Sequence, residues 1–100
     1  MTLHGIEIPE DKIADFCRRN NIRKLALFGS VLTDEFGPES DVDVLVEFEP
    51  GGSVGLFGFV GLQDELTDML GRKVDLSAPG DTAGRFWPRV LQEAVTIYAQ

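Results

Sequence analysis

The chain has 100 residues, of which 43% are hydrophobic, and this is enough for one small hydrophobic core. We therefore expect a single domain over residues 1–100, without a second, substrate-binding domain. The formal net charge of −8 argues against broad electrostatic binding to nucleic acids or anionic membranes, because both are polyanions.

No apolar segment is long enough to cross a membrane, and no basic-then-apolar segment opens the sequence. These features predict a cytoplasmic protein that is not associated with a membrane. Cys17 is the only cysteine, which excludes an intramolecular disulfide. Its helix-spaced apolar neighbours Ile13 and Phe16 predict that Cys17 packs in the core.

The first half of the chain predicts a helix followed by two strands. Pro9 and the two acidic residues after it favour the start of a helix, since proline lacks an N–H group that the first turn would leave unpaired. Residues 22–28 are mostly apolar on both faces, which predicts a central strand covered on two sides. Residues 31–36 form one helical turn or a loop, and residues 41–48 form the second strand.

The second half predicts two further helices and one strand. Residues 59–70 carry apolar side chains at helical spacing and are followed by Gly71, a residue type that commonly ends helices. Residues 73–77 alternate between apolar and polar side chains, which predicts a short strand. Pro88 is expected to begin a last helix with an apolar stripe of Val90, Leu91, Ala94, Val95 and Tyr98. The element order predicts an α/β or α+β fold in which helices flank a small mixed sheet.

Two carboxylates lie within the otherwise Val-rich second strand. Because side chains alternate along a strand, Asp41 and Asp43 point to the same face, opposite to Val42 and Val44. Their Cα atoms are expected about 6.6 Å apart, which is twice the rise per strand residue. Two like charges on one face repel each other, and a divalent cation would offset that repulsion. The pair therefore predicts a magnesium site that also accepts the oxygens of a nucleoside triphosphate.

Gly29 and Ser30 directly follow the first strand. A glycine at this position permits close approach of the backbone, and a serine at the start of a short helix offers a hydroxyl and N–H groups to an anion. We interpret the pair as the other half of a triphosphate site. Taken separately, a Gly-Ser pair is usually a turn and a D-x-D segment is usually a solvated strand face, so only their combination indicates a function.

Gly29-Ser30, ten further residues and Asp41-Val42-Asp43 together resemble the G-S-x10-D-x-D signature of the DNA polymerase beta-like nucleotidyltransferase superfamily. The segments ALFGS, GPESDVDVLVEFEPG and GRKVDLSAPG are similar to those of its minimal nucleotidyltransferase (MNT) branch. The resemblance runs from about residue 22 to residue 77, and it implies the minimal polymerase beta-like nucleotidyltransferase fold.

The resemblance also implies roles for individual residues. Gly29 and Ser30 would contact the triphosphate of ATP, and Asp41 and Asp43 would hold two magnesium ions. Asp75, in the segment KVDLS, would be the third carboxylate of the metal site and would help to activate the attacking hydroxyl.

MNT proteins are commonly paired with a helical HEPN-domain toxin, and they act as its antitoxin by adding adenylate to a tyrosine of that toxin. The resemblance therefore implies a magnesium-dependent nucleotidyltransferase that moves AMP from ATP onto a hydroxyl of a partner protein, with which it could form an oligomer. A chain without an acceptor domain must take its acceptor from another molecule, which agrees with this setting. The Gly-rich and apolar segment at residues 55–62 is the expected partner surface.

One departure from the MNT pattern keeps two alternatives open. Many MNT sequences have an arginine shortly after Gly-Ser, whereas here Val31 and Thr33 are followed by the acidic Asp34. The missing positive charge would have to come from Arg18, Arg19, Arg72, Lys73 or Arg85. The first alternative is a catalytically weak or inactive module that neutralises its partner by occlusion. The second is a transferase that acts on a small molecule or an RNA end, which the net acidity and the single domain disfavour. The acceptor, the nucleotide base and the oligomeric state stay open.

Overall fold

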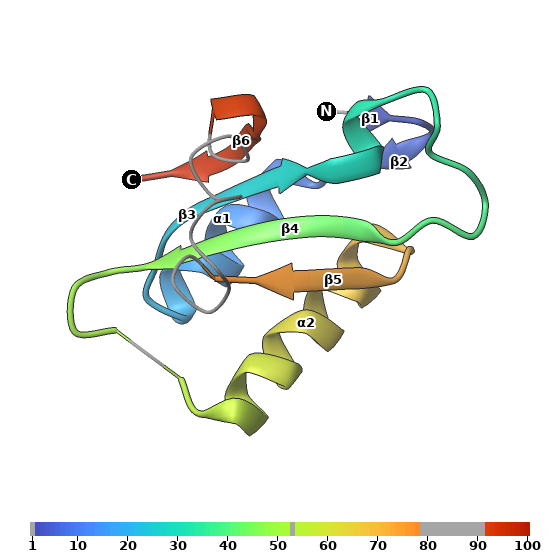
Figure 1. Cartoon of the computed structure of the whole chain (residues 1–100). Coiled ribbons are helices and arrows are strands. Elements are labelled where there is room, and N and C mark those ends of the chain that lie inside the picture. The colour runs from blue at the N-terminus through green and yellow to red at the C-terminus, as the bar shows by residue number, and fades with distance from the viewer. Residues whose placement is uncertain (1, 53, 79–91) are drawn as a thin grey trace.

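The computed structural model describes residues 2–52, 54–78 and 92–100, which form a four-stranded sheet, a short N-terminal hairpin and two α-helices (Figure 1). In chain order the elements are β1 (Thr2–Leu3), β2 (Ile6–Glu7), α1 (Glu10–Arg19), β3 (Ile22–Phe28), the 3-10 helix η1 (Gly29–Leu32), β4 (Val42–Phe48), α2 (Leu56–Leu70), β5 (Val74–Ser77) and β6 (Val95–Ala99).

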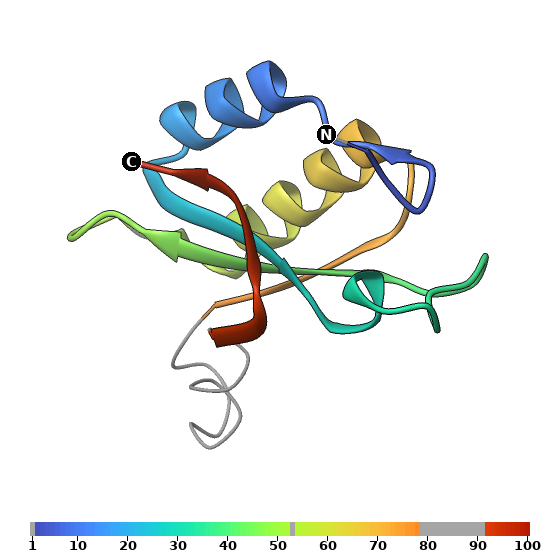
Figure 2. The same ribbon diagram turned by 90° about the horizontal axis from the view of Figure 1, so that it is seen from above.

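The sheet has the strand order β5-β4-β3-β6. Strand β3 is antiparallel to both of its neighbours, whereas β4 and β5 are parallel and are connected through α2. Both helices lie on the same face of this sheet (Figure 2). The predicted mixed sheet with flanking helices is therefore confirmed, and its second face is not covered by either α-helix.

The core lies between the sheet and the two helices. Alternate residues of β3 and β4 point toward the helices, as Leu25 and Val44 show, and both are 0% exposed. Ile13 and Phe16 of α1 and Leu66 of α2 are also 0% exposed. This alternation sends the intervening residues of each strand to the open face, where the candidate site lies.

Helix α1 begins where the sequence predicts. Pro9 is its N-cap, and the first turn carries the acidic Glu10 and Asp11. Cys17 is buried and unpaired, as predicted, and this burial raises the pKa of its thiol to about 12. Because the thiolate is the reactive form, Cys17 is an inert core residue.

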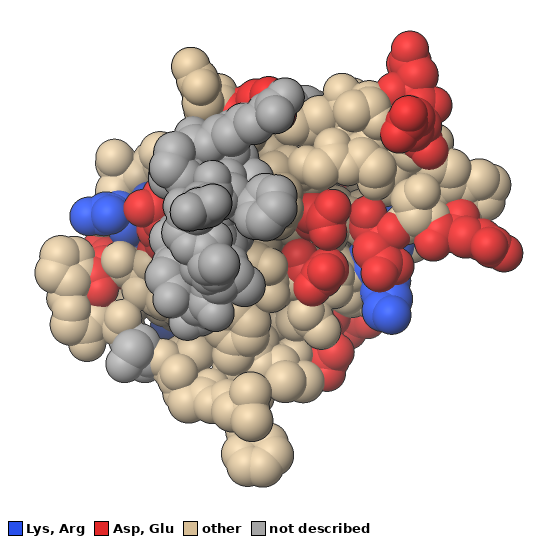
Figure 3. Space-filling model, in the orientation of Figure 1, with Lys and Arg blue, Asp and Glu red and all other residues tan. Residues whose placement is uncertain are grey.

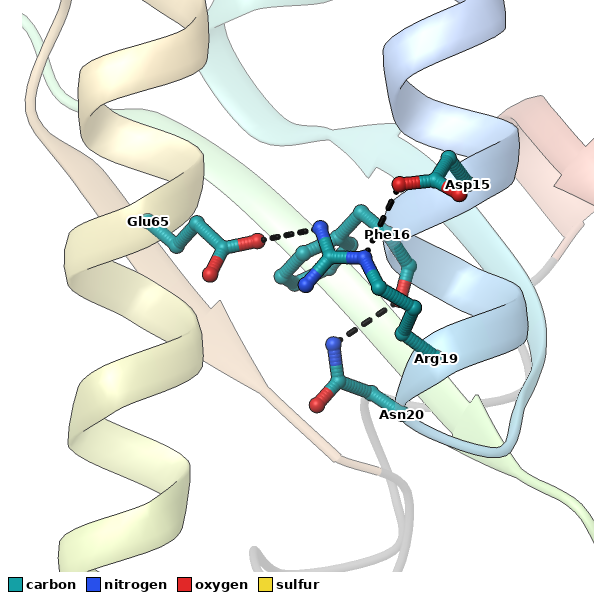
Figure 4. A network of polar contacts seen from close by, with 5 residues as sticks. All are labelled: Asp15, Phe16, Arg19, Asn20 and Glu65. Atoms are coloured by element: carbon teal, nitrogen blue, oxygen red, sulfur yellow. Dashed lines mark hydrogen bonds and ion pairs between the residues drawn. The ribbon is translucent and has the colours of Figure 1, made fainter.

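Polar contacts on the surface join α1 to α2 (Figure 4). The Arg19 guanidinium donates to Asp15 one turn earlier at 2.9 Å and to Glu65 of α2 at 3.0 Å. The side-chain amide of Asn20 donates to the Phe16 carbonyl at 2.8 Å. Exposed ion pairs contribute only about 0.2–1 kcal/mol each, so this network orients the helices more than it stabilises them.

Helix α2 positions β5 through its side chains. The helix begins at Leu56, before the expected residue 59, and ends as predicted at Gly71, which is left-handed with φ of 70°. The N–H of Val74 donates to the Thr67 hydroxyl at 3.1 Å, and the N–H of Leu76 donates to Oε1 of Gln63 at 3.0 Å. The edge strand β5 is thereby fixed to the helix that precedes it. Within the described residues, no helix is both long and apolar enough to cross a membrane.

The expected C-terminal helix is wrong for residues 95–99, which form strand β6. This strand pairs with β3, with Tyr98 opposite Leu25 and Val95 opposite Leu27. The segment V-T-I-Y consists of β-branched and aromatic residues, which favour strands, and β6 covers an edge of β3 that would otherwise be unpaired. Residues 92–93 are helical, while Pro88, Val90 and Leu91 lie outside the described residues.

The N-terminal hairpin was not expected from the sequence. Its two strands have two residues each, which is too short for any recognisable periodicity. The connecting residues His4 and Gly5 have φ values of 50° and 76°. Positive φ at both central positions is the requirement of a type I′ turn, which matches the twist of a hairpin.

Candidate active site

The candidate site lies on the open face of the sheet, where β3 ends and where β4 and β5 begin. Asp43 of β4 is the register partner of Phe28 on one side and of Asp75 on the other. Gly29 follows Phe28 directly, so the sheet places the Gly-Ser pair and two of the predicted carboxylates on neighbouring strands. Figure 3 presents this face to the viewer and shows acidic side chains gathered on it.

The three predicted carboxylates are close enough to affect one another. The pKa of Asp43 is raised, first because the side chain is partly buried, and then because the negative charges of Asp75 and Asp41 lie nearby. Asp41 is half-buried and Asp75 is exposed. The arrangement gathers negative charge on the open face of the sheet, where a positively charged ligand would relieve the repulsion.

The carboxylates do not form a closed metal cage. Across residues 2–52, 54–78 and 92–100, no three His, Cys, Asp or Glu side chains are grouped closely enough to hold a metal ion together. Magnesium usually takes one or two carboxylates together with phosphate oxygens and several waters. One or two of the three carboxylates therefore suit a metal ion that is bound jointly with a nucleotide.

Gly29 is required by both its backbone and its surroundings. Its φ is +78°, in the left-handed region, and a Cβ atom built on it would lie 2.1 Å from Oδ2 and 3.1 Å from Cγ of Asp43. Real side chains do not approach so closely, so only glycine lets the end of β3 pass beside the Asp43 carboxylate. The absence of a Cβ at Gly29 leaves the space that the Asp43 carboxylate occupies.

Val31 and Thr33, which follow the Gly-Ser pair, have structural roles. Val31 is 1% exposed and belongs to the core. Thr33 closes η1, because its N–H and its hydroxyl both donate to the Ser30 carbonyl at 2.9 Å. No hydrogen bond to another described residue engages the Ser30 hydroxyl, which remains available to a ligand.

Two of the five basic residues proposed to replace the missing charge have other partners. Arg19 is engaged with Asp15 and Glu65 on the helix side of the sheet. Arg72 donates to backbone carbonyls in the loop before Asp41, a role that the sequence analysis missed. The only signal in the sequence was its place between the helix-ending Gly71 and β5. Arg85 lies outside the described residues.

The raised pKa of Asp43 predicts how this residue affects stability. Between the ordinary value of 3.8 and the higher native pKa, the folded protein holds a proton that the unfolded chain has released. The stability that Asp43 contributes is therefore lost as the pH rises through this interval. We expect Asp43→Asn to unfold at a higher temperature than the wild type in metal-free buffer at pH 7, and the difference to disappear at pH 3.8 and below. Thermal denaturation across this pH range measures the effect, and equal midpoints at pH 7 would contradict it.

Residues 10–97 match the model of the family described as "Nucleotidyltransferase domain". The chain is 35% identical to the protein adenylyltransferase MntA of Thermococcus cleftensis, over 97% of this chain and 88% of that protein.

Solved structures of minimal nucleotidyltransferases are also similar to this chain. A structure described as a putative minimal nucleotidyltransferase is 32% identical, covers 86% of each chain and has a TM-score of 0.71. The MNT antitoxin of Shewanella oneidensis, solved in complex with a tri-AMPylated HEPN toxin, has a TM-score of 0.63 at 20% identity, over 91% of this chain and 70% of that one. The latter identity supports a shared fold and no more.

Proposed function

The chain belongs to the nucleotidyltransferase domain family, and from this premise we propose that it transfers AMP from ATP onto a hydroxyl of a partner protein. The observation that carries the proposal is the contact between Gly29 and Asp43. The backbone at the end of β3 thereby lies against the Asp43 carboxylate, which has the carboxylates of Asp41 and Asp75 nearby. A phosphate-binding segment and a metal-binding set of oxygens would need this proximity.

The proposed reaction assigns a task to each side chain. Asp41 and Asp43 would hold Mg²⁺. The ion would lower the pKa of the attacking hydroxyl and stabilise the negative charge of the leaving pyrophosphate. The hydroxyl oxygen forms a bond to the α-phosphorus, and the bond from that phosphorus to the oxygen bridging to the β-phosphate breaks. Asp75, the exposed carboxylate, would accept the hydroxyl proton. The Ser30 hydroxyl would donate to a phosphate oxygen.

A HEPN-domain toxin is the partner that we propose. Support comes from the similar fold of the Shewanella antitoxin, whose own partner is a HEPN toxin. Support also comes from the start of α2, within the expected partner surface at residues 55–62. There Leu56 is 76% exposed and Phe57 is 92% exposed, and Val60 is exposed as well. Large apolar side chains gathered on a surface are typical of protein interfaces.

Occlusion without catalysis is the second candidate function. The observation that favours it is the absence of a basic residue directly after the Gly-Ser pair, since Val31 and Thr33 are used for packing and for closing η1. The same α2 surface would serve this function equally well, so binding to a toxin does not separate the two candidates.

Transfer to a HEPN protein can be measured directly. We expect the chain, incubated with ATP, Mg²⁺ and a HEPN-domain protein, to add one or more adenylates to that protein, as read by intact-mass spectrometry. Chelation of the metal should stop the addition, because the carboxylates alone repel a triphosphate. If no nucleotide is added under any condition while the toxin is still neutralised, occlusion is the function and the transferase proposal fails.

A further inference from the structure

We propose that Arg72 is a positioning residue for the reaction, because it fixes the segment between Gly29 and Asp41; this inference rests on the proposed function. Nη2 of Arg72 donates to the carbonyls of Gly37 and Ser40 at 2.8 Å each, and to that of Pro38 at 3.2 Å. One guanidinium thus binds the loop that leads directly into the first carboxylate of the site.

Two consecutive residues, Arg72 and Lys73, hold the backbone on both sides of Asp41. The Ser40 carbonyl, just before it, accepts from the Arg72 side chain. The N–H of Val42, just after it, donates to the Lys73 carbonyl at 2.9 Å. Because β5 begins at Val74 and carries Asp75, these bonds fix the position of Asp41 relative to the strand of the third carboxylate.

Arg72 also contacts the end of the segment that begins with the Gly-Ser pair. Its guanidinium carbon lies 4.6 Å from the centre of the Phe36 ring. The centre of that ring is 5.2 Å from the centre of the His4 ring, in the turn of the N-terminal hairpin. Phe36 is therefore held between two side chains, and the chain from Gly29 to Phe36 is restrained at both ends.

Electrostatics explain why the loop needs such a restraint. Between η1 and β4 the chain carries four acidic residues, Asp34, Glu35, Glu39 and Asp41. Their repulsion would open the loop, whereas a cation bound to its carbonyls opposes this. Arginine suits the position better than lysine, because its flat guanidinium stacks on the Phe36 ring while Nη2 donates to the loop carbonyls.

The test compares three variants of the complete chain by their binding of Mn²⁺ in the presence of a non-hydrolysable ATP analogue. Arg72→Met is expected to weaken Mn²⁺ binding by about 10–100-fold, the usual effect of losing a residue that orients a metal ligand. Arg72→Lys should give partial rescue. Lys12→Met, which removes an exposed cation from α1, is the matched control and should bind as the wild type does. In Arg72→Met, the amide NMR shifts should differ from those of the wild type mainly at residues 29–42.

Each outcome decides the inference. If folded Arg72→Met binds Mn²⁺ and the analogue as tightly as the wild type, Arg72 is only structural and the inference fails, even if the melting temperature falls. If Arg72→Met does not fold, Arg72→Lys decides: weaker binding supports the inference and unchanged binding overturns it. If the wild type itself binds no Mn²⁺ with the analogue, the proposed function fails together with the inference.

Discussion

Asp43→Asn is expected to abolish adenylate transfer while the protein stays folded. Asparagine keeps the shape of the side chain but removes one negative charge from the centre of the site, where Asp43 lies beside Asp75 and close to Asp41. Loss of a direct metal ligand removes several kcal/mol of transition-state stabilisation, which corresponds to a loss on the order of a thousandfold in rate. Intact-mass measurement of the HEPN partner after incubation with ATP and Mg²⁺ gives the result.

The matched control is Asp68→Asn, which removes an exposed carboxylate of α2 on the helix side of the sheet. It should transfer adenylate at the wild-type rate. Binding of Asp43→Asn to the partner should also persist, since the proposed partner surface, with the exposed Leu56, Phe57 and Val60, lies on α2 and not on the open face of the sheet. Transfer by Asp43→Asn within tenfold of the wild-type rate would show that Asp43 holds no essential metal ion.

Among substitutions that add a single methyl group near the site, we expect Gly29→Ala to be the most destabilising. The left-handed backbone disfavours any Cβ, and this Cβ would also overlap Oδ2 of Asp43 at 2.1 Å. Backbone strain and overpacking each cost about 1–3 kcal/mol, so we expect a loss of about 2–4 kcal/mol in the free energy of unfolding. Urea denaturation measures it, and transfer activity should fall as Asp43 is displaced.

Gly51→Ala separates the two causes. Gly51 has nearly the same φ, +79°, but a Cβ on it would have no atom within 4 Å. Its substitution should therefore show the cost of the backbone conformation alone. The additional cost at Gly29 should shrink when Asp43 is also replaced by alanine, because the overlapping carboxylate is then gone. Equal losses for Gly29→Ala and Gly51→Ala would contradict the proposed contact.

The sequence predicts those parts of the fold whose pattern is long enough to be unambiguous. Helix α1 and strands β3 and β4 each extend over seven residues or more, and their apolar spacing suits only one kind of element. The five residues of β6 are different, because their apolar side chains fit a helical stripe as well as a strand. Pairing with the edge of β3 favours the strand. The residues close to β6 in the sequence carry no information about that edge.

Some features of the candidate site could likewise be predicted from the sequence, and others could not. Strand alternation predicts that Asp41 and Asp43 share one face, although β4 begins only at Val42, one residue after the predicted start. The pairing of Asp43 with Asp75 depends on the register of two strands that are separated by α2, and only the family resemblance indicated it. The role of Arg72 was not predictable, because its partners are backbone carbonyls and any residue type offers the same carbonyl group.

The bonds between α2 and β5 also affect how the sheet meets other chains. An exposed edge strand can act as a template for an added strand, and this is a common route to aggregation and strand exchange. On β5 the N–H groups of Val74 and Leu76 already donate to Thr67 and Gln63. A second chain could extend the sheet there only by breaking both bonds, so the helix that connects the two parallel strands also protects this edge against self-assembly.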